Sequence, residues 1–170
     1  MTNRGRLPRL ARLALCFMIP AVLSGIAIPA SAVEKPARVI TLMASGATLG
    51  IDDLNVQGAS PGDVRTLSLA LTNVKGQPAG RAEIVQTLTH VDGNVGTAVK
   101  VVVLNLPRGT ITGLGVTEFT DFTNPQSRPN DETEHIAITG GTDAYRGASG
   151  QIDVQVLPNF SSRWIISLDR

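Results

Sequence analysis

Apolar and polar residues alternate with a period of two along much of the chain after residue 36. In residues 65–73, for example, small or polar residues separate Leu67, Leu69 and Leu71, and β-branched residues are frequent in the later segments. A period of two puts alternate side chains on opposite faces of an extended strand, so the pattern indicates strands with one face in a core. The expected strands are 37–43, 65–73, 80–91, 97–106, 109–122, 133–139, 149–157 and 161–169.

Turn residues separate these segments. Short clusters rich in Gly, Pro, Asn and Asp predict hairpin loops, and they occupy residues 60–63, 75–78, 92–94 and 107–109. Residues 123–132 predict a longer exposed loop, and residues 46–57 are compatible with a short turn. About eight strands joined in this way predict an all-β antiparallel meander. Periodicity alone allows either a closed barrel or a two-layer sandwich, and favours the barrel slightly because closure removes the exposed edges.

The N-terminus has the order of regions typical of a secretory signal. Four arginines (4, 6, 9 and 12) precede an apolar run over residues 13–28, and residues 29–32 are small. We expect cleavage after Ala32, which leaves a signal at 1–32 and one domain at 33–170. A retained membrane anchor is the alternative, but the run is short for a membrane-spanning helix and is broken by Pro20 and Gly25. The predicted location is therefore outside the membrane, either extracellular or periplasmic, with no stable membrane anchor.

Cleavage changes the charge and the cysteine chemistry. Removing four of the 15 basic residues leaves 11 against 14 acidic ones, a net charge of −3. Without a basic stripe, nucleic acid is not an expected partner. The only cysteine, Cys16, also leaves with the signal, so the domain has neither a disulfide nor a thiolate metal site.

A glycine-rich segment near the C-terminus carries a family resemblance. Residues 136–152 read Ile-Ala-Ile-Thr-Gly-Gly-Thr-Asp-Ala-Tyr-Arg-Gly-Ala-Ser-Gly-Gln-Ile. The segment resembles the signature of allene oxide cyclase and dirigent-like barrels, and residues 60–63 and 106–115 resemble pieces found in bacterial members. The resemblance covers about 120 residues. It implies an eight-stranded antiparallel closed barrel, often trimeric, with an apolar pocket opening at one end.

Two positions depart from the family pattern. Asp143 stands where a glycine is usual, and since Asp tolerates a positive φ we expect the turn to survive. Many secreted relatives place a cysteine on each of two neighbouring strands, at positions that correspond to Gln86 and roughly Lys100, so the resemblance implies that this family disulfide is missing here.

The glycine-rich segment itself allows two interpretations. Gly140, Gly141 and Gly147 could expose N–H groups to a phosphate, but no Lys-Ser/Thr pair ends the segment and a strand, not a helix, is expected after it. We therefore expect a tight turn in which Tyr145 packs over the end of the barrel.

Few residues suit acid–base chemistry. His90 flanks a predicted hairpin at the rim of the barrel, and its ordinary pKa suits a general acid or base. Glu118 lies inside a predicted strand, where a carboxylate facing the lumen would be desolvated. These two residues are the catalytic candidates. The aromatic residues Tyr145, Trp164 and Phe119 are the substrate-binding candidates.

Other polar residues are expected to be solvated. These are Glu134 and His135 beside the acidic loop, Asp63 and Arg65 after a turn, and Glu83, which alternates with apolar neighbours. The spacing of the two histidines supports no metal site. We expect no cofactor and no metal.

The functional expectation follows from the resemblance and from this short inventory. The chain is expected to be a secreted barrel that binds a small apolar molecule and acts as a cofactor-free cyclase or isomerase guiding a reactive intermediate. The alternatives are a non-enzymatic, dirigent-like or hydrophobic-ligand-binding protein, and a barrel filled by its own side chains. A homotrimer is implied by the resemblance alone.

Overall fold

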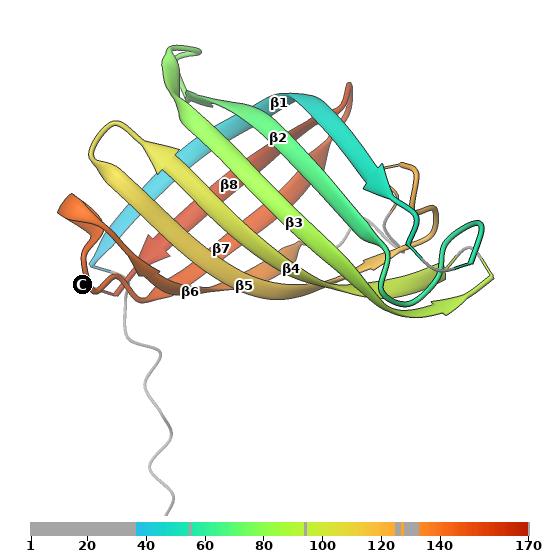
Figure 1. Ribbon diagram of the computed structural model, residues 1–170. Coiled ribbons are helices and arrows are strands. Elements are labelled where there is room, and N and C mark those ends of the chain that lie inside the picture. The colour runs from blue at the N-terminus through green and yellow to red at the C-terminus, as the bar shows by residue number, and fades with distance from the viewer. Residues whose placement is uncertain (1–36, 55, 94, 125–126, 128–132, 170) are drawn as a thin grey trace, which may run out of the picture. The chain divides into compact units, whose positions relative to one another are not determined.

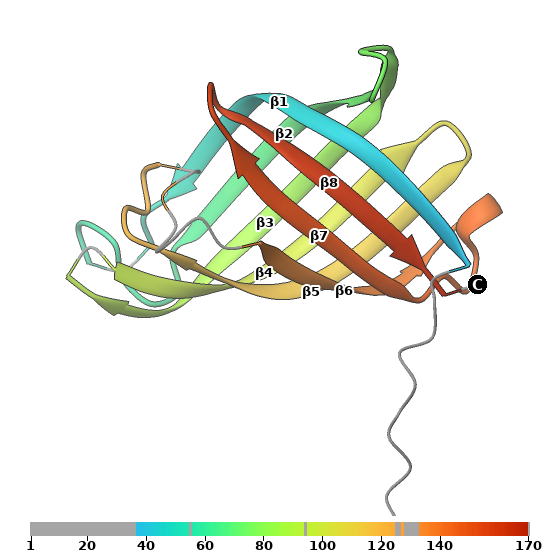
Figure 2. The ribbon, with the colours of Figure 1, turned by 180° about the vertical axis from the view of Figure 1, so that it is seen from behind.

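The fold is an eight-stranded antiparallel barrel, seen from two opposite sides in Figures 1 and 2. The computed structural model describes residues 37–54, 56–93, 95–124, 127 and 133–169. Each strand pairs with the next, and β8 pairs with β1, so the barrel prediction is confirmed over the sandwich. The strands are β1 (Arg38–Asp52), β2 (Val64–Asn73), β3 (Pro78–Asp92), β4 (Val95–Leu106), β5 (Gly109–Phe119), β6 (Glu134–Gly141), β7 (Gly150–Leu157) and β8 (Ser161–Leu168).

Helical structure in the described part of the chain is limited to a single 3₁₀ turn, η1 (Asp143–Tyr145). No helix in these residues has the length and apolarity needed to cross a membrane. The predicted signal at 1–32 and its cleavage site lie outside the described residues.

Strand β1 is longer than the sequence pattern predicts. Its pairing with β2 shifts register between Ser45 and Thr48 and then continues to Asp52. Gly46 lies in this bulge with φ 64°, a conformation that glycine adopts without steric cost. The expected turn at 46–57 is therefore wrong over residues 46–52, because the extra residue interrupts the alternation without ending the strand. The other seven strands begin and end within three residues of the expected bounds.

The two ends of the barrel differ. We call the end that carries η1 the helix end, and the end that carries residues 56–63 and 120–124 the loop end (Figure 1). At the helix end Tyr145 is buried, and the Arg38 guanidinium carbon lies 5.6 Å from its ring centroid. Asp143 adopts φ 50°, so the glycine-rich segment does form the expected tight turn with Asp in place of Gly.

Two apolar clusters fill the interior. The larger one extends from the helix end through the middle of the barrel and includes Val102, Ile136 and Ile166, each with none of its surface exposed. The smaller one lies toward the loop end and consists of Leu88, Ala98, Phe119 and Phe122. Polar side chains separate the two clusters.

Candidate functional site

A layer of polar side chains crosses the interior between the two apolar clusters. Along β3, for example, Ile84 belongs to the larger cluster, Gln86 follows it on the same face, and Leu88 belongs to the smaller cluster. Five consecutive strands, β2 to β6, each contribute one member, and every member is at most 8% exposed. This set, called the polar layer below, is Arg65, Gln86, Lys100, Thr117 and Glu134.

Strand register explains why these residues meet. Arg65 on β2 lies directly opposite Gln86 on β3, and Gln86 lies directly opposite Lys100 on β4. Side chains opposite each other on one face of an antiparallel pair have Cβ atoms about 5 Å apart. The two positions that correspond to cysteines in the resembling family are therefore neighbours on adjacent strands, as the resemblance implies. Here they carry an amide and an ammonium group.

Arg65 fastens the loop end to the barrel from the inside. Its Nε donates to Gln86 Oε1 at 2.6 Å, and its Nη1 donates to the carbonyl oxygens of Phe122 at 2.8 Å and Asn124 at 3.4 Å. The guanidinium carbon also lies 5.1 Å from the Phe122 ring centroid and 6.0 Å from that of Phe119. The guanidinium thus satisfies backbone acceptors of a loop and contacts two aromatic rings at once. The expectation that Arg65 is solvated is wrong, because this loop covers it.

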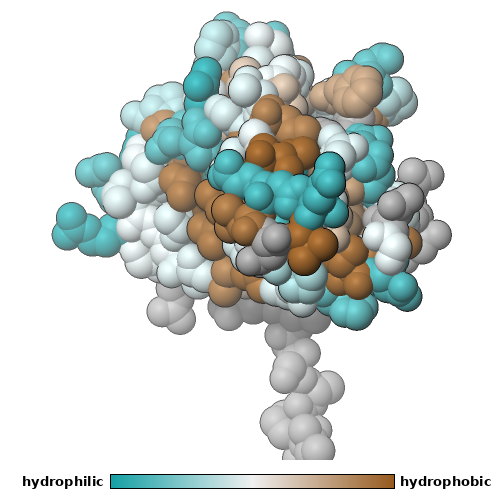
Figure 3. Space-filling view, turned by 45° about the vertical axis from the view of Figure 1, so that its right-hand side comes forward, coloured by the Kyte–Doolittle hydropathy of each residue, from teal (hydrophilic) through white to brown (hydrophobic). Residues whose placement is uncertain are grey.

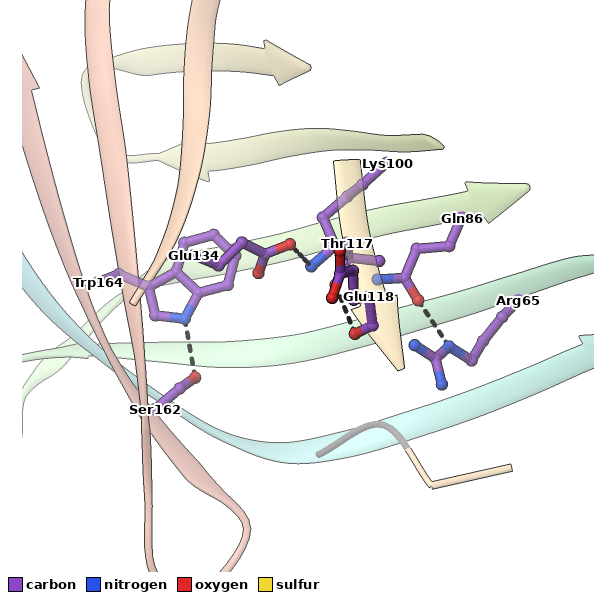
Figure 4. A network of polar contacts seen from close by, with 8 residues as sticks. All are labelled: Arg65, Gln86, Lys100, Thr117, Glu118, Glu134, Ser162 and Trp164. Carbon is purple, nitrogen blue, oxygen red and sulfur yellow. Dashed lines mark hydrogen bonds and ion pairs between the residues drawn. The ribbon is translucent and has the colours of Figure 1, made fainter. Parts of the chain in front are cut away.

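Lys100 and Glu134 form a buried ion pair. Lys100 Nζ lies 2.5 Å from Glu134 Oε1, and each side chain is 5% exposed (Figure 4). Burying either charge alone would cost several kcal/mol, so each group depends on the other. The expected surface position is confirmed for His135, which is exposed, and wrong for Glu134, which points inward one residue earlier.

The orientation of the Gln86 amide follows from its partner. A guanidinium only donates hydrogen bonds, so the atom that faces Arg65 must be the amide oxygen. The NH₂ group therefore points away from Arg65, toward the side of Lys100 and Thr117 (Figure 4). Gln86 is 3% exposed, and the hydrogen bond of its side chain is the one that its oxygen accepts from Arg65. No buried side-chain nitrogen or oxygen among the described residues lacks a hydrogen-bond partner, so the NH₂ group is not an unsatisfied buried donor.

A partly enclosed pocket lies next to Gln86 and Lys100 of the polar layer. Its volume is about 60 Å³, and it opens between the β1 bulge and the β7–β8 hairpin, where the exposed residues Ala47 and Phe160 line it. Figure 3 brings the loop end forward and shows apolar residues interspersed with hydrophilic ones on this side of the barrel. The pocket is lined by Ala47, Leu67, Leu69, Ile84, Gln86, Lys100, Val154, Val156, Phe160, Ser162 and Trp164.

Trp164 forms one wall of the pocket. Its side chain is 2% exposed, and its Nε1 donates to Ser162 Oγ at 2.8 Å. This bond satisfies the only polar atom of the indole, so the ring presents apolar surface to the pocket. Of the three predicted substrate-binding residues, the structure brings only Trp164 to this pocket. Phe119 packs in the smaller apolar cluster and Tyr145 lies at the helix end.

The predicted catalytic residues lie elsewhere. Glu118 and His90 are both exposed, on the outer face of β5 and near the end of β3. Both are close to Thr97 in register, so they are near one another outside the barrel. Alternation already placed Leu114 and Val116 on the face of Glu118, and those two residues are exposed as well. The catalytic assignments stay predictions, but the structure does not bring either side chain to the pocket.

Asp63 is buried, contrary to expectation. It is 1% exposed, and its carboxylate accepts hydrogen bonds from Leu54 N at 2.9 Å and from Ser60 N at 2.7 Å. The Leu54 N–H holds the pKa of Asp63 below its ordinary value of 3.8, burial acts in the opposite direction, and Ser60 lowers the pKa further. Asp63 is thus a structural anion that fixes the turn before β2.

Sequence reasoning missed the polar layer, although one signal was present. Lys100 shares its face of β4 with Val102 and Leu104, and a charge in register with apolar residues marks an inward position. No arrangement of three or more His, Cys, Asp or Glu side chains suited to a metal occurs in the part of the chain that the structure describes.

Solved structures share this barrel at low sequence identity. Pyocyanin demethylase is 20% identical with a TM-score of 0.62, and the match covers 77% of this chain and 99% of that one. The Diels–Alderase AbmU from Streptomyces koyangensis is 16% identical with a TM-score of 0.56, over 76% of this chain and 63% of AbmU. AbnU, an exo-specific intermolecular Diels–Alderase, is 18% identical with a TM-score of 0.52, over 77% of this chain and 98% of that one.

These similarities establish the fold, which is a barrel of the kind found in cyclases and Diels–Alderases. No protein-family model and no curated protein sequence matches the chain. None of these three structures is named as an allene oxide cyclase or a dirigent protein, so that finer resemblance stays a prediction.

Proposed function

We propose that the protein is an exported barrel that binds a small, largely apolar molecule in the pocket and holds it in one reactive conformation, as a cofactor-independent cyclase or isomerase. The observation that carries the proposal is an apolar pocket whose floor is a buried charged layer. Leu67, Ile84, Val154 and the Trp164 ring would contact the carbon skeleton. Gln86 and Lys100 would contact a polar group and so fix its orientation.

The chemistry needs little from the protein. In a unimolecular cyclisation a ring bond forms at the expense of a π bond within one molecule, and no oxidant, reductant or co-substrate is consumed. Holding the reacting ends together and excluding water are the main contributions that a barrel interior can make. A pocket with few ionisable groups is suited to that role.

Pocket size restricts the ligand. Engineered apolar cavities that hold benzene measure about 150 Å³. The volume of about 60 Å³ found here accommodates only part of such a molecule. The rest of the ligand would lie in the mouth, beside Ala47 and Phe160. The proposal therefore favours a slender conjugated chain over a bulky polycycle.

A second candidate function is non-enzymatic binding of the same class of molecule. Of the described residues that line the pocket, only Lys100 is ionisable, and it is already paired with Glu134. A pocket without another proton donor or acceptor supports carriage of a ligand as well as it supports catalysis by orientation.

The test compares linear polyenes and allylic epoxides incubated with the purified protein or with buffer. Products of unchanged mass are sought by chromatography coupled to mass spectrometry. The protein contains one tryptophan, so quenching of Trp164 emission reports occupancy of the pocket. Ala47→Phe should block the mouth, whereas Val39→Phe adds the same ring to an exposed site on the same strand outside the pocket.

Each result has a defined meaning. Isomerised product that is formed by the wild type and by Val39→Phe, but not by Ala47→Phe, supports the cyclase or isomerase. Saturable quenching without turnover, again lost only in Ala47→Phe, supports the carrier. If neither quenching nor turnover occurs with any of these compounds, the pocket proposal is wrong and the barrel is filled by its own side chains.

A further inference from the structure

We infer that Lys100 is a reactive amine that forms an imine with a carbonyl group of the ligand, and that this ligand is a slender conjugated aldehyde. The inference rests on the proposed function, because it names the polar group that would reach the floor of the pocket and the residue that would bond to it. Nothing in the apolar lining requires it, because the same walls would hold a hydrocarbon chain.

The first observation is the position of the amine. Of the two cations in the polar layer, Arg65 and Lys100, only Lys100 lines the pocket. The lining around it is mostly apolar and includes Ile84, Val154 and Trp164. A lysine amine in apolar surroundings can attack a carbonyl carbon, whereas a guanidinium stays protonated and cannot. The cation at the pocket is therefore the one that is able to form a covalent bond.

The second observation is a proton acceptor in contact with the amine. Lys100 Nζ lies 2.5 Å from Glu134 Oε1, and each side chain is 5% exposed. Figure 4 shows the Lys100 side chain extending toward Glu134, with Trp164 on the same side. An ammonium group becomes nucleophilic only when it loses a proton, and a carboxylate at this distance can accept it. The transfer turns two buried charges into two neutral groups, so neither charge is left unpaired.

The covalent step balances in atoms and charge. After Glu134 takes a proton from Lys100, the Nζ lone pair forms a bond to the carbonyl carbon, and the carbonyl oxygen receives the proton from Glu134. A second proton passes from nitrogen through Glu134 to the new hydroxyl group, the C–O bond breaks to release water, and the nitrogen lone pair forms the C=N bond. The resulting iminium carries one positive charge beside the Glu134 carboxylate. The ion pair present at the start is thus present again at the end.

The size of the pocket favours an aldehyde over a ketone. A volume of about 60 Å³ beside Lys100 takes only the end of a ligand, and an aldehyde carbon carries a hydrogen where a ketone carries a second carbon group. An iminium at this end withdraws electrons from a conjugated chain, which activates the chain for ring closure or isomerisation. Addition of one water to the product iminium then returns the carbonyl and the Lys100 amine.

The experiment incubates the purified protein with sorbaldehyde, a linear conjugated aldehyde, and sodium cyanoborohydride at pH 7. The hydride reduces an iminium to a stable secondary amine, and peptide mapping by mass spectrometry shows which lysine carries it. The lysines of the chain are Lys35, Lys75 and Lys100, and Lys75 is exposed between β2 and β3. Because the pocket would hold the carbonyl against the amine, Lys100 should react about tenfold or more faster than Lys75.

Variants of the mouth test whether the aldehyde reaches Lys100 through the pocket. Ala47→Phe should suppress the modification of Lys100 without changing that of Lys75, and Val39→Phe should change neither. Sorbyl alcohol fits the same pocket but has no carbonyl group. It should protect Lys100 from sorbaldehyde and leave Lys75 unprotected.

Titrations without the hydride compare the two compounds by quenching of Trp164 emission. A covalent bond predicts that the wild type binds sorbaldehyde about tenfold or more tightly than sorbyl alcohol. Lys100→Met/Glu134→Leu removes the amine together with its partner, so no buried charge is left alone, and this variant should lose the preference for the aldehyde. The matched control, Arg81→Met/Glu83→Leu, removes an exposed ion pair and should keep the preference. If the first variant does not fold, Lys100→Arg replaces it, because it keeps the charge and forms no imine.

Several outcomes would contradict the inference. If sorbyl alcohol quenches Trp164 but Lys100 is modified no faster than Lys75, the ion pair is only structural, and the pocket proposal stands without the inference. Modification of Lys100 that persists in Ala47→Phe would also overturn the inference, as would equal affinity of the wild type for the aldehyde and the alcohol. Absence of both quenching and modification would overturn the proposed function together with the inference.

Discussion

The buried ion pair between Lys100 and Glu134 makes a strong prediction about stability. The charged atoms lie 2.5 Å apart and each side chain is 5% exposed, so removing one partner leaves the other charged group with little access to water. We expect Lys100→Met and Glu134→Leu each to lower the free energy of unfolding by about 3–5 kcal/mol. The double variant removes both charges, and we expect it to lie within about 1 kcal/mol of the wild type or above it.

Urea unfolding at pH 7 measures these differences. With a slope of about 2 kcal/mol per M, each single variant should shift the midpoint down by roughly 2 M, as followed by Trp164 emission and far-ultraviolet circular dichroism. If a single variant fails to fold, recovery of folding in the double variant is the equivalent result. The exposed pair of Arg81 and Glu83 is the control, since its charged atoms are 3.9 Å apart and its side chains are 63% and 44% exposed. Its removal should cost less than about 1 kcal/mol.

One outcome would refute this reasoning. If the loss in the double variant equals the sum of the two single losses, the two side chains contribute independently. The short contact would then carry no coupling energy.

Three further predictions concern the scaffold. Ile166→Ala should lower the free energy of unfolding by about 2–5 kcal/mol in urea, since the side chain is fully buried; a loss below 1 kcal/mol would contradict tight packing. Gly150→Ala should lower the melting temperature several times more than Gly76→Ala. At Gly76 the φ of 78° costs Ala about 1–2 kcal/mol and a Cβ would meet nothing, whereas at Gly150 the φ is 128° and a Cβ would lie 2.0 Å from the Ser167 carbonyl oxygen. Folding lowers the pKa of Asp63, so its ionised form stabilises the fold at neutral pH, and this stability is lost as the pH falls below about 4. Asp63→Asn should therefore flatten the acid limb of a stability–pH curve, and an unchanged limb would mean that other carboxylates control it.

Much of the fold could be predicted because burial repeats along each strand. The leucines of β2 and the alternating residues of β7 and β8 lie on the faces that the pattern assigned to them. The continuation of β1 could not be predicted in this way. A bulge at Gly46 shifts which residues face inward, and local alternation carries no signal for an inserted residue.

The site was less predictable for a different reason. Whether Arg65 is buried depends on residues 120–124, which include Phe122, 57 positions further along the chain. The burial of Glu134 depends likewise on Lys100, 34 positions away. Charged residues are read as solvated unless a partner is known, and a single sequence does not show which distant groups become partners.

Closure of the barrel determines when β1 can complete its pairing during folding. Residue 38 pairs with residue 168, so β1 has no permanent neighbour on one side until β8 is available. Until then two rows of unpaired amides and carbonyls, one on β1 and one on β7, can recruit strands from other molecules. Such distant pairings also form slowly, which lengthens the period of risk. Losing β8 would therefore do more than remove one strand, because β1 and β7 would both become edge strands that can pair with other molecules.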